Sequence, residues 1–450
     1  MTVIVPGVLT RKPKWKQLLP EIPATRFSCV TSGSLRPKLG LCILSVVLVV
    51  ALCLLIVPFV DSPKMSSSVQ HADAVKAVAK ANQDFGAKLY PHLVKAKGEG
   101  ENLIMSPFSV SSVMAMALAG ARSGTADQMK TGLGLEHEAQ ITHNGYDDVL
   151  SLLKSNEDFT LEAANKLYAQ SGFDLLESYQ EMAKSHYKAP VESLNFAEAE
   201  ASRKVINDFV EEHTQQKIKD LIPSGVLDAL TRLVLVNAVY FKGNWADQFN
   251  PKHTTKEKFT VSPTESVEVD MMHKTAEFNA TYAKDLFDAT ILEVPFKGDR
   301  LSMYFILSKK PEEFAAMEEK FPSFDFVNLN LSQKVKFDVH IPKFKLETSH
   351  NLNAPLQALG MTDMFDSNSA DFSGISGKQD LFVSDVLQKA FIEVNEEGSE
   401  AAAATGAIMM TRMMVMNPRL LCNRPFLFVI KDKLTGMVLF NGRVVNPNKQ

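Results

Sequence analysis

Helical patterns precede strand patterns in this chain, and that order limits its fold more than any other feature. From His71 to Gln450 the 450-residue sequence has no linker rich in Pro, Gly or Ser, no internal repeat and no long block of charge. One domain of about 380 residues is therefore expected, which is larger than a typical domain. Helices followed by strands favour an α+β domain over an alternating, doubly wound sheet.

The helices are expected in the first half of this domain. Apolar residues recur at helical spacing over residues 72–93, and residues 197–214 have a similar amphipathic pattern. Ser106 and Pro107 precede the apolar run 110–121. A hydroxyl cap followed by an early proline is typical of a helix start, so a helix is predicted there.

The strands are expected in the second half. Residues 233–241 are rich in β-branched and aromatic side chains and are numerous enough for a central strand. Similar runs predict further strands over residues 301–307, 334–341, 390–394, 426–430 and 438–441. Leu434, Thr435 and Gly436 separate the last two runs, which predicts a hairpin.

An uncharged apolar segment, residues 39–60, comes before the domain. Its 22 residues would span a hydrocarbon core of ~30 Å at about 1.5 Å per residue. Residues 1–38 contain seven Lys or Arg and a single acid, Glu21, and basic residues on this side predict that it stays in the cytoplasm. The sequence thus predicts a basic tail (1–38), a transmembrane signal-anchor or signal-like segment (39–60), a linker (61–70) and a domain (71–450).

Two other interpretations of this segment stay open. It could be the h-region of a cleaved signal peptide, although it exceeds the usual length of about 7–15 residues and lacks a clear Ala-x-Ala site. Translation could instead begin at Met65, which would leave the domain cytoplasmic. The domain keeps a single cysteine, Cys422, and this suits a reducing compartment.

We expect translocation, which would make the chain a single-pass type II membrane protein, or a secreted one after cleavage. The domain would then be extracellular or lumenal. Two sequons, at Asn279 and Asn330, would be glycosylated only in that case.

The usual signatures of catalysis and of cofactor binding are missing from the sequence. It has no GxSxG, GxxxxGK[ST], CxxC or HExxH pattern. His137 and His143 are six positions apart, a spacing that does not bring both imidazoles to one face of a helix. The formal net charge of −4 gives no reason to expect nucleic acid as a partner. We therefore expect no enzyme, no cofactor and no bound metal.

The segment between Gly398 and Arg412 has an unusual composition. Glu400 is the only charged residue from Gly398 to Thr411, and proline is absent. Composition alone favours a flexible connector or a short helix, because alanine has the best helix propensity. With a period of two, however, one face carries mostly small residues: Ser399, Ala401, Ala403, Thr405, Ala407 and Met409. Such a strand could enter a sheet without steric clashes, and Arg412 would fit the pocket of a trypsin-like protease.

Several motifs, in the right order, resemble those of the serpins, a family of serine protease inhibitors. The hinge motif of that family matches Glu396, Glu397, Gly398, Ser399, Glu400, Ala401, Ala402, Ala403, Ala404 and Thr405. Its C-terminal signature matches residues 423–428, 440–444 and 446–447. The resemblance covers residues 71–450 and is greatest to the intracellular, ovalbumin-like branch, which lacks a signal peptide. Residues 1–64 depart from the pattern of that branch.

Other segments resemble parts of the serpin sheet that open or close. Ser106 and Ser109 lie in a segment similar to the family's "shutter", and His340 lies in one similar to a further shutter strand. Asn237 and Trp245 lie in a segment similar to the strand and turn beside the point where the loop inserts. The resemblance implies that these five residues are structural and perform no chemistry on a substrate.

The resemblance also implies a fold and a mechanism. The fold would have three β-sheets, about nine helices and an exposed reactive-centre loop. A protease would attack the loop and form an acyl-enzyme, after which the cut loop would insert as a new strand and distort the trapped protease. Family spacing from Gly398 places the cleaved bond between Arg412 and Met413.

We therefore expect a monomeric inhibitor that forms a covalent complex with trypsin-like serine proteases. Neighbouring methionines would give cleavage sites to chymotrypsin- or elastase-like proteases: Met409, Met410, Met413, Met414 and Met416. The alternative is a non-inhibitory, membrane-tethered binding or chaperone protein whose loop is incidental.

Overall fold

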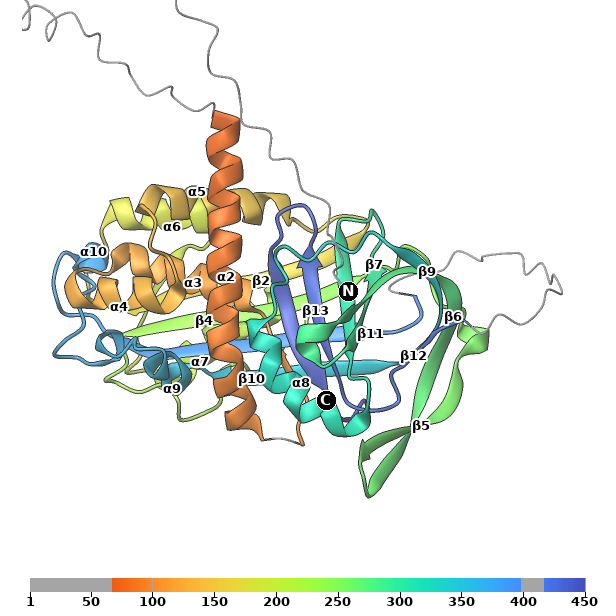
Figure 1. Ribbon diagram of the computed structural model, residues 1–450. Helices are drawn as coiled ribbons and strands as arrows, with labels where there is room; N and C mark the ends of the chain where they lie inside the picture. Colours follow the sequence, from red (N-terminus) through yellow and green to blue (C-terminus); the bar gives the residue numbers. More distant parts are fainter. Residues whose placement is uncertain (1–66, 99, 398–416, 450) are drawn as a thin grey trace, which may run out of the picture. The chain divides into compact units, whose positions relative to one another are not determined.

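Two β-sheets and nine α-helices make up the described part of the chain, which is residues 67–98, 100–397 and 417–449 of a computed structural model (Figure 1). The α-helices are α2 (Ser67–Lys97), α3 (Pro107–Gly120), α4 (Ser123–Leu133), α5 (Ala139–Leu152), α6 (Glu177–Tyr187), α7 (Ala199–His213), α8 (Phe314–Lys320), α9 (Asn353–Ala358) and α10 (Ser373–Ser376). Short 3-10 helices lie in the connections: η1 (Pro251–His253), η2 (Lys284–Leu286), η3 (Pro311–Glu313), η4 (Phe321–Ser323) and η5 (Asp363–Phe365).

The smaller sheet has five strands in the order β10-β11-β4-β2-β3. Its strands are β2 (Phe159–Gln170), β3 (Val191–Leu194), β4 (Leu233–Gly243), β10 (Phe344–Asn351) and β11 (Val383–Val394). The neighbours β11 and β4 run parallel, whereas β10 is antiparallel to β11 and β2 is antiparallel to β4. A parallel pair therefore occupies the centre of this sheet.

The larger sheet has nine strands in the order β1-β14-β13-β8-β7-β6-β9-β12, with β5 paired to β6. They are β1 (Leu103–Met105), β5 (Thr255–Ser262), β6 (Glu265–Ala283), β7 (Ala289–Pro295), β8 (Leu301–Leu307), β9 (Lys334–Pro342), β12 (Arg419–Leu421), β13 (Phe426–Asp432) and β14 (Val438–Val444). The 19-residue strand β6 pairs with β5, β9 and β7. Two of the three predicted sheets are thus continuous through β6, and the predicted α+β fold is confirmed.

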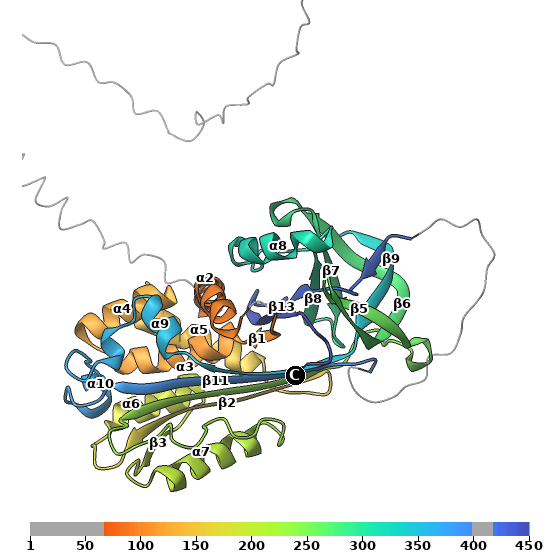
Figure 2. The ribbon, with the colours of Figure 1, turned by 90° about the horizontal axis from the view of Figure 1, so that it is seen from below.

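The five-stranded sheet is covered on both faces. Figure 2 shows α7 on one face and α2, α3, α4 and α5 on the other. Along β4, Leu233, Leu235 and Val239 enter the core shared with α3, whereas Val234 and Val236 enter the core under α7. A strand that is buried on both faces is an unbroken apolar run, which is why the sequence identified β4 correctly.

Several predicted element boundaries are confirmed. Ser106 caps α3 by accepting a hydrogen bond from the N–H of Ser109, and Pro107 occupies the first turn. The strands β13 and β14 form the predicted antiparallel hairpin, and Gly436 in its turn has a φ of +77°. Helix α2 begins at Ser67, so it includes the last residues of the predicted linker 61–70.

Strand β11 was only partly predicted. It begins at Val383, whereas the sequence indicated residues 390–394. Polar side chains interrupt its first seven residues: Ser384, Asp385, Gln388 and Lys389. Its position between β10 and β4, rather than its apolar pattern, makes this segment a strand.

His350 gives the fold a dependence on pH. It lies on β10, is buried, and its Nε2 is 3.0 Å from the carbonyl oxygen of Ile104 on β1. Burial lowers the pKa of His350 from 6.5 to about 4, although the contact with Ile104 opposes this. Between these two values the unfolded chain binds a proton that the native protein does not, so stability falls as the pH falls.

We therefore predict that His350 alone lowers the free energy of unfolding by about 2 kcal/mol between about pH 7.5 and pH 5. Urea unfolding at both pH values should show a smaller loss for His350→Gln than for the wild type. The matched control is His213→Gln, at an exposed position on α7, which should keep the wild-type dependence. An unchanged loss in His350→Gln would contradict the prediction.

Candidate functional site

Three side-chain amides form a row across the centre of the five-stranded sheet. Asn165 lies on β2, Asn237 on β4 and Gln388 on β11, and the strand register pairs Asn237 with both of the others. Gln388 Nε2 donates to Asn237 Oδ1 at 2.7 Å, and Asn237 Nδ2 donates to Asn165 Oδ1 at 2.5 Å. This amide row therefore joins β4 to β11 by a side-chain hydrogen bond in addition to the backbone ladder.

The N-terminus of α3 supports the amide row from one side of the sheet. Ser109 Oγ accepts a hydrogen bond from Asn237 and donates to Asn165 Oδ1 at 3.0 Å. The carbonyl oxygen of Ser106 accepts from Gln388 Nε2 at 3.0 Å. Ser106, Ser109, Asn237 and Gln388 are all fully buried. Because a buried polar group is costly unless it is paired, these contacts define one closed arrangement of the sheet.

The structure brings together three of the residues that the sequence singled out, Ser106, Ser109 and Asn237. Sequence reasoning missed Asn165 and Gln388, although each is a polar residue that pairs directly with Asn237. His340 lies elsewhere, on β9 of the larger sheet, with its Nε2 3.2 Å from Asp338 Oδ2. It does not contribute to the amide row, because its strand belongs to a different sheet.

A second polar cluster holds the chain where it leaves β11. We call Glu396, Lys343 and Thr254 the hinge anchor. Glu396 Oε2 lies 2.8 Å from Lys343 Nζ, and Thr254 Oγ1 donates to Glu396 Oε1 at 2.7 Å. The backbone N–H of Phe249 donates to the carbonyl oxygen of Glu396 at 3.0 Å. Burial works to raise the pKa of Glu396, but the contacts with Lys343 and Thr254 lower it overall, so the carboxylate stays ionised at neutral pH.

Trp245, just after β4, packs beside the hinge anchor. Its ring stacks on Phe296 with centroids 4.6 Å apart, and its Nε1 donates to the carbonyl oxygen of Asn395 at 2.8 Å. Gln248 Nε2 donates to the carbonyl oxygen of Glu397 at 3.0 Å. The backbone from Asn395 to Glu397 is thus fixed to the segment that follows β4.

The other predicted site residues are placed as follows. Residues 398–405, Arg412 and Met413 lie outside the described residues. Asn279 on β6 is partly buried and donates to Glu293 at 3.0 Å, and Asn330 is exposed before β9.

The chain rejoins the described structure in the larger sheet. Strand β12 pairs in parallel with β9, with Arg419 opposite Asp338 and Leu421 opposite His340. Cys422 follows this strand and is fully buried, which raises the pKa of its thiol to about 12. A thiol in that state is not a nucleophile at neutral pH. The two ends of the loop region are therefore held by two different sheets.

Comparisons with known proteins agree with this arrangement. The serpin family model, described as serine protease inhibitor, matches residues 80–447. Serpin B6 of Macaca fascicularis is 40% identical over 377 residues, which is 82% of this chain and 99% of that protein. Serpin B8 of Homo sapiens is 38% identical over 377 residues, with the same two coverages.

A solved structure has the same fold. Serpin48 of the insect Tenebrio molitor, described as a highly specific serpin, has a TM-score of 0.74 and 36% identity, over 85% of this chain and 100% of that one. The chain belongs to the serpin family and is close to its ovalbumin-like branch. Serpins inhibit proteases rather than act as catalytic enzymes, and protease inhibition is the general activity that this membership indicates.

These findings contradict the predicted signal-anchor and the predicted extracellular or lumenal location. Residues 39–60 lie outside the described residues, but across 67–98, 100–397 and 417–449 we find no helix with the length and apolarity that a membrane span requires. Serpin B6 and Serpin B8 match over 99% of their own length and indicate the branch that lacks a signal peptide. The predicted glycosylation of Asn279 and Asn330 depended on translocation, so its basis is lost.

The amide row should respond to mutation as one unit. Gln388→Leu would leave Asn237 Oδ1 and the carbonyl oxygen of Ser106 without this donor, which should cost about 2 kcal/mol of stability. The double variant Asn237→Leu/Gln388→Leu should lose less stability than the sum of the losses in the two single variants, because the two side chains are coupled. Urea unfolding of the intact protein measures all three variants.

A matched control for this cycle is Gln357→Leu, at an exposed position on α9, which should change stability by less than about 0.5 kcal/mol. Strict additivity of Asn237→Leu and Gln388→Leu would contradict the role assigned to the amide row.

Proposed function

We propose that this serpin inhibits trypsin-like serine proteases as a suicide substrate that is cleaved between Arg412 and Met413. The serpin domain would span residues 71–450. One observation carries the proposal: two parallel strands, β4 and β11, are neighbours at the centre of a sheet, and the predicted hinge directly follows β11.

The direction of the strands favours insertion between them. A chain that leaves β11 and turns back would run antiparallel to both β11 and β4. One parallel ladder would then be replaced by two antiparallel ladders, and antiparallel pairing is slightly more stable per residue. Backbone groups of the loop would exchange water for partners in the ladders, which supports an inserted state of lower free energy.

The length and side chains of the loop fit the same proposal. β11 has 12 residues and is about 40 Å long, and residues 399–412 would span ~46 Å when extended. The positions with a period of two from Ser399 are small up to Ala407, so the new strand would not clash with the core under α3. Insertion would have to break the hydrogen bond between Gln388 and Asn237, and the amide row therefore opposes premature insertion.

The identity of residue 412 supports the choice of protease. A trypsin-like enzyme has an acid at the base of its specificity pocket, which pairs with an Arg side chain. The methionines near this bond would make chymotrypsin- or elastase-like proteases secondary targets.

The substitution Ser399→Arg should convert the inhibitor into a substrate, because a long charged side chain would enter the sheet at the first inserted position. Mixed with trypsin, the wild type should give an SDS-resistant band heavier than either partner. The variant should be nicked after Arg412 with little or no such band.

Ser367→Arg, at an exposed position, adds the same side chain outside the sheet and should inhibit normally. A wild type that is merely nicked would favour a non-inhibitory serpin, and a Ser399→Arg variant that still traps trypsin would overturn insertion.

Cleavage should also stabilise the protein. We predict that the melting temperature rises by about 5 °C or more once the bond after Arg412 is cut, because the added ladders contribute several kcal/mol. The variant Arg412→Gln should resist this cut, keep the melting temperature of the intact protein and lose inhibition of trypsin. Differential scanning calorimetry compares the intact protein with the cut protein that is separated from the covalent complex after limited trypsin treatment. Equal melting temperatures for cut and intact wild type would be inconsistent with the proposal.

A further inference from the structure

Three potential metal ligands from three strands converge in the larger sheet. They are Glu257 on β5, His273 on β6 and His340 on β9, and one ligand atom of each lies within 4.8 Å of the other two. The strand register places His273 directly opposite His340. Figure 1 shows β5, β6, β9 and β12 at one side of the molecule, away from the helices around α4.

The distances between these atoms suit a small divalent cation. His273 Nε2 lies 2.7 Å from Glu257 Oε1, and His340 Nδ1 lies 4.0 Å from the same oxygen. Zinc bonds of about 2.0–2.1 Å in a tetrahedron place the ligand atoms roughly 3.4 Å apart, between these two separations. Small side-chain rotations would therefore complete the site. The side chains of Glu257, His273 and His340 are 29%, 25% and 14% exposed, so the cluster borders solvent, and a rotation of the His340 ring would open its buried nitrogens to an ion.

His340 also has the surroundings of a metal-binding histidine. Neither of its ring nitrogens makes a well-formed hydrogen bond, although both are buried. Its Nε2 lies 3.2 Å from Asp338 Oδ2, and its Nδ1 is the nitrogen nearer to Glu257. A ligating histidine commonly presents its second nitrogen to a carboxylate, which orients the ring. Arg419 and Thr275 hold Asp338 in turn, at 3.1 Å each.

We propose that Glu257, His273 and His340 form a Zn²⁺ site with Asp338 as a positioning residue for His340. Two imidazoles and one carboxylate are ligands that zinc prefers, whereas Ca²⁺ and Mg²⁺ prefer oxygen ligands. Three protein ligands leave the fourth position for water. Thr255 Oγ1 lies 3.0 Å from His273 Nε2 and donates to Glu257 at 3.3 Å, so it borders that position.

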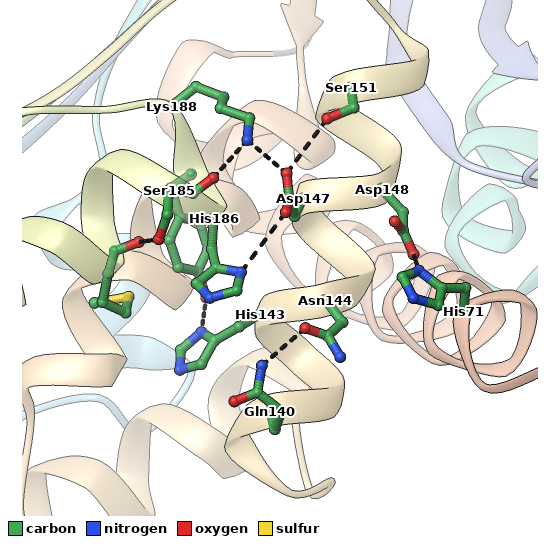
Figure 3. A network of polar contacts seen from close by, with 12 residues as sticks. His71, Gln140, His143, Asn144, Asp147, Asp148, Ser151, Ser185, His186 and Lys188 are labelled. Atoms are coloured by element: carbon green, nitrogen blue, oxygen red, sulfur yellow. Dashed lines mark hydrogen bonds and ion pairs between the residues drawn. The ribbon is translucent and has the colours of Figure 1, made fainter. Parts of the chain in front are cut away.

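A second histidine pair in the described structure also has a buried ring nitrogen without a hydrogen bond, at His186, but its neighbouring carboxylate is paired with a lysine, so it provides the control. Figure 3 shows His143 on α5 beside His186 on α6, with Asp147 nearby. His143 Nδ1 is engaged with the hydroxyl of Tyr187 at 2.8 Å. The carboxylate of Asp147 lies 3.8 Å from His186 and is paired with Lys188 at 2.6 Å. A lysine beside the carboxylate repels a metal ion, so we expect no zinc binding at this pair.

Zinc would also strengthen the strand that receives the C-terminal end of the loop. Leu421 on β12 pairs with His340, and the N–H of Cys422 donates to the carbonyl oxygen of His340 at 2.9 Å. A metal bound at the three ligands would join β5 and β9 across β6. Hydrogen exchange at the amide of Cys422 should therefore slow when Zn²⁺ is added.

Titration calorimetry of the untagged full chain with Zn²⁺ tests the proposal. The accessible thiols are first alkylated in the folded protein, because they would otherwise compete as ligands, whereas the buried thiol of Cys422 neither reacts nor competes. The wild type should bind one equivalent of Zn²⁺. The ligand variants His273→Gln and His340→Gln should each weaken binding at least tenfold. The variant Asp338→Asn, which removes the positioning carboxylate, should weaken it roughly tenfold. Cobalt should give the visible bands of a tetrahedral site, and an excess of Mg²⁺ should not displace zinc.

The control His143→Gln should bind zinc like the wild type. Melting curves in the presence of a chelator check that each variant is folded, and Glu257→Gln is a further ligand variant in case one histidine variant is not. A wild type without stoichiometric binding, or folded His273→Gln and His340→Gln variants with unchanged affinity, would overturn the proposal. Both outcomes are independent of protease inhibition, since neither uses a protease.

Discussion

The parallel pairing of β4 with β11 is the interaction on which the rest of this molecule depends. Both strands pair antiparallel with their outer neighbours, β2 and β10, so β4 and β11 run in the same direction at the centre of the sheet, whereas the other parallel pair, β2 and β3, lies at its edge. An antiparallel strand can be added between them without reversing any existing strand. The chain that follows β11 continues directly from one of these two strands.

The polar contacts around this pair affect the rate at which the sheet opens more than the free-energy difference between its closed and inserted states. A typical side-chain hydrogen bond contributes about 1 kcal/mol net, and the amide row and hinge anchor contain only a few of them. Two new ladders along a 12-residue strand would outweigh that sum. Opening, however, first separates buried groups such as Asn237 and Gln388 before any new partner arrives, and each unpaired group costs about 1–3 kcal/mol. The closed sheet is thus held kinetically on the proposed mechanism.

The parts of the fold that the sequence predicted are those in which local and global preferences agree. Ser106 and Pro107 form a helix start by themselves, and β4 is apolar because both of its faces are buried. The first half of β11 was missed because polar residues such as Gln388 interrupt its apolar pattern. Gln388 hydrogen-bonds Asn237 across the sheet, and only the strand register reveals this contact.

The same reasoning explains the misplaced and missed site residues. The motif around His340 resembled a shutter strand, but only the topology shows that β9 belongs to the other sheet. The zinc ligands were invisible to a search for closely spaced motifs, because each comes from a different strand. Residues 39–60 resembled a membrane anchor by composition alone, and the composition of this segment does not determine the location of the serpin domain.

The hinge anchor and strand β12, which hold the two ends of the loop region, differ in what the proposed mechanism requires of them. If a strand is to grow from β11, Glu396 must break its contacts with Lys343 and Thr254 or move together with these residues. β12 has no such task, since it belongs to a sheet that insertion does not open. A metal at Glu257, His273 and His340 would therefore brace the stationary end of the loop while leaving the pair β4 and β11 free to separate. Zinc affinity and insertion should then be separable properties of this chain, because they depend on different strands.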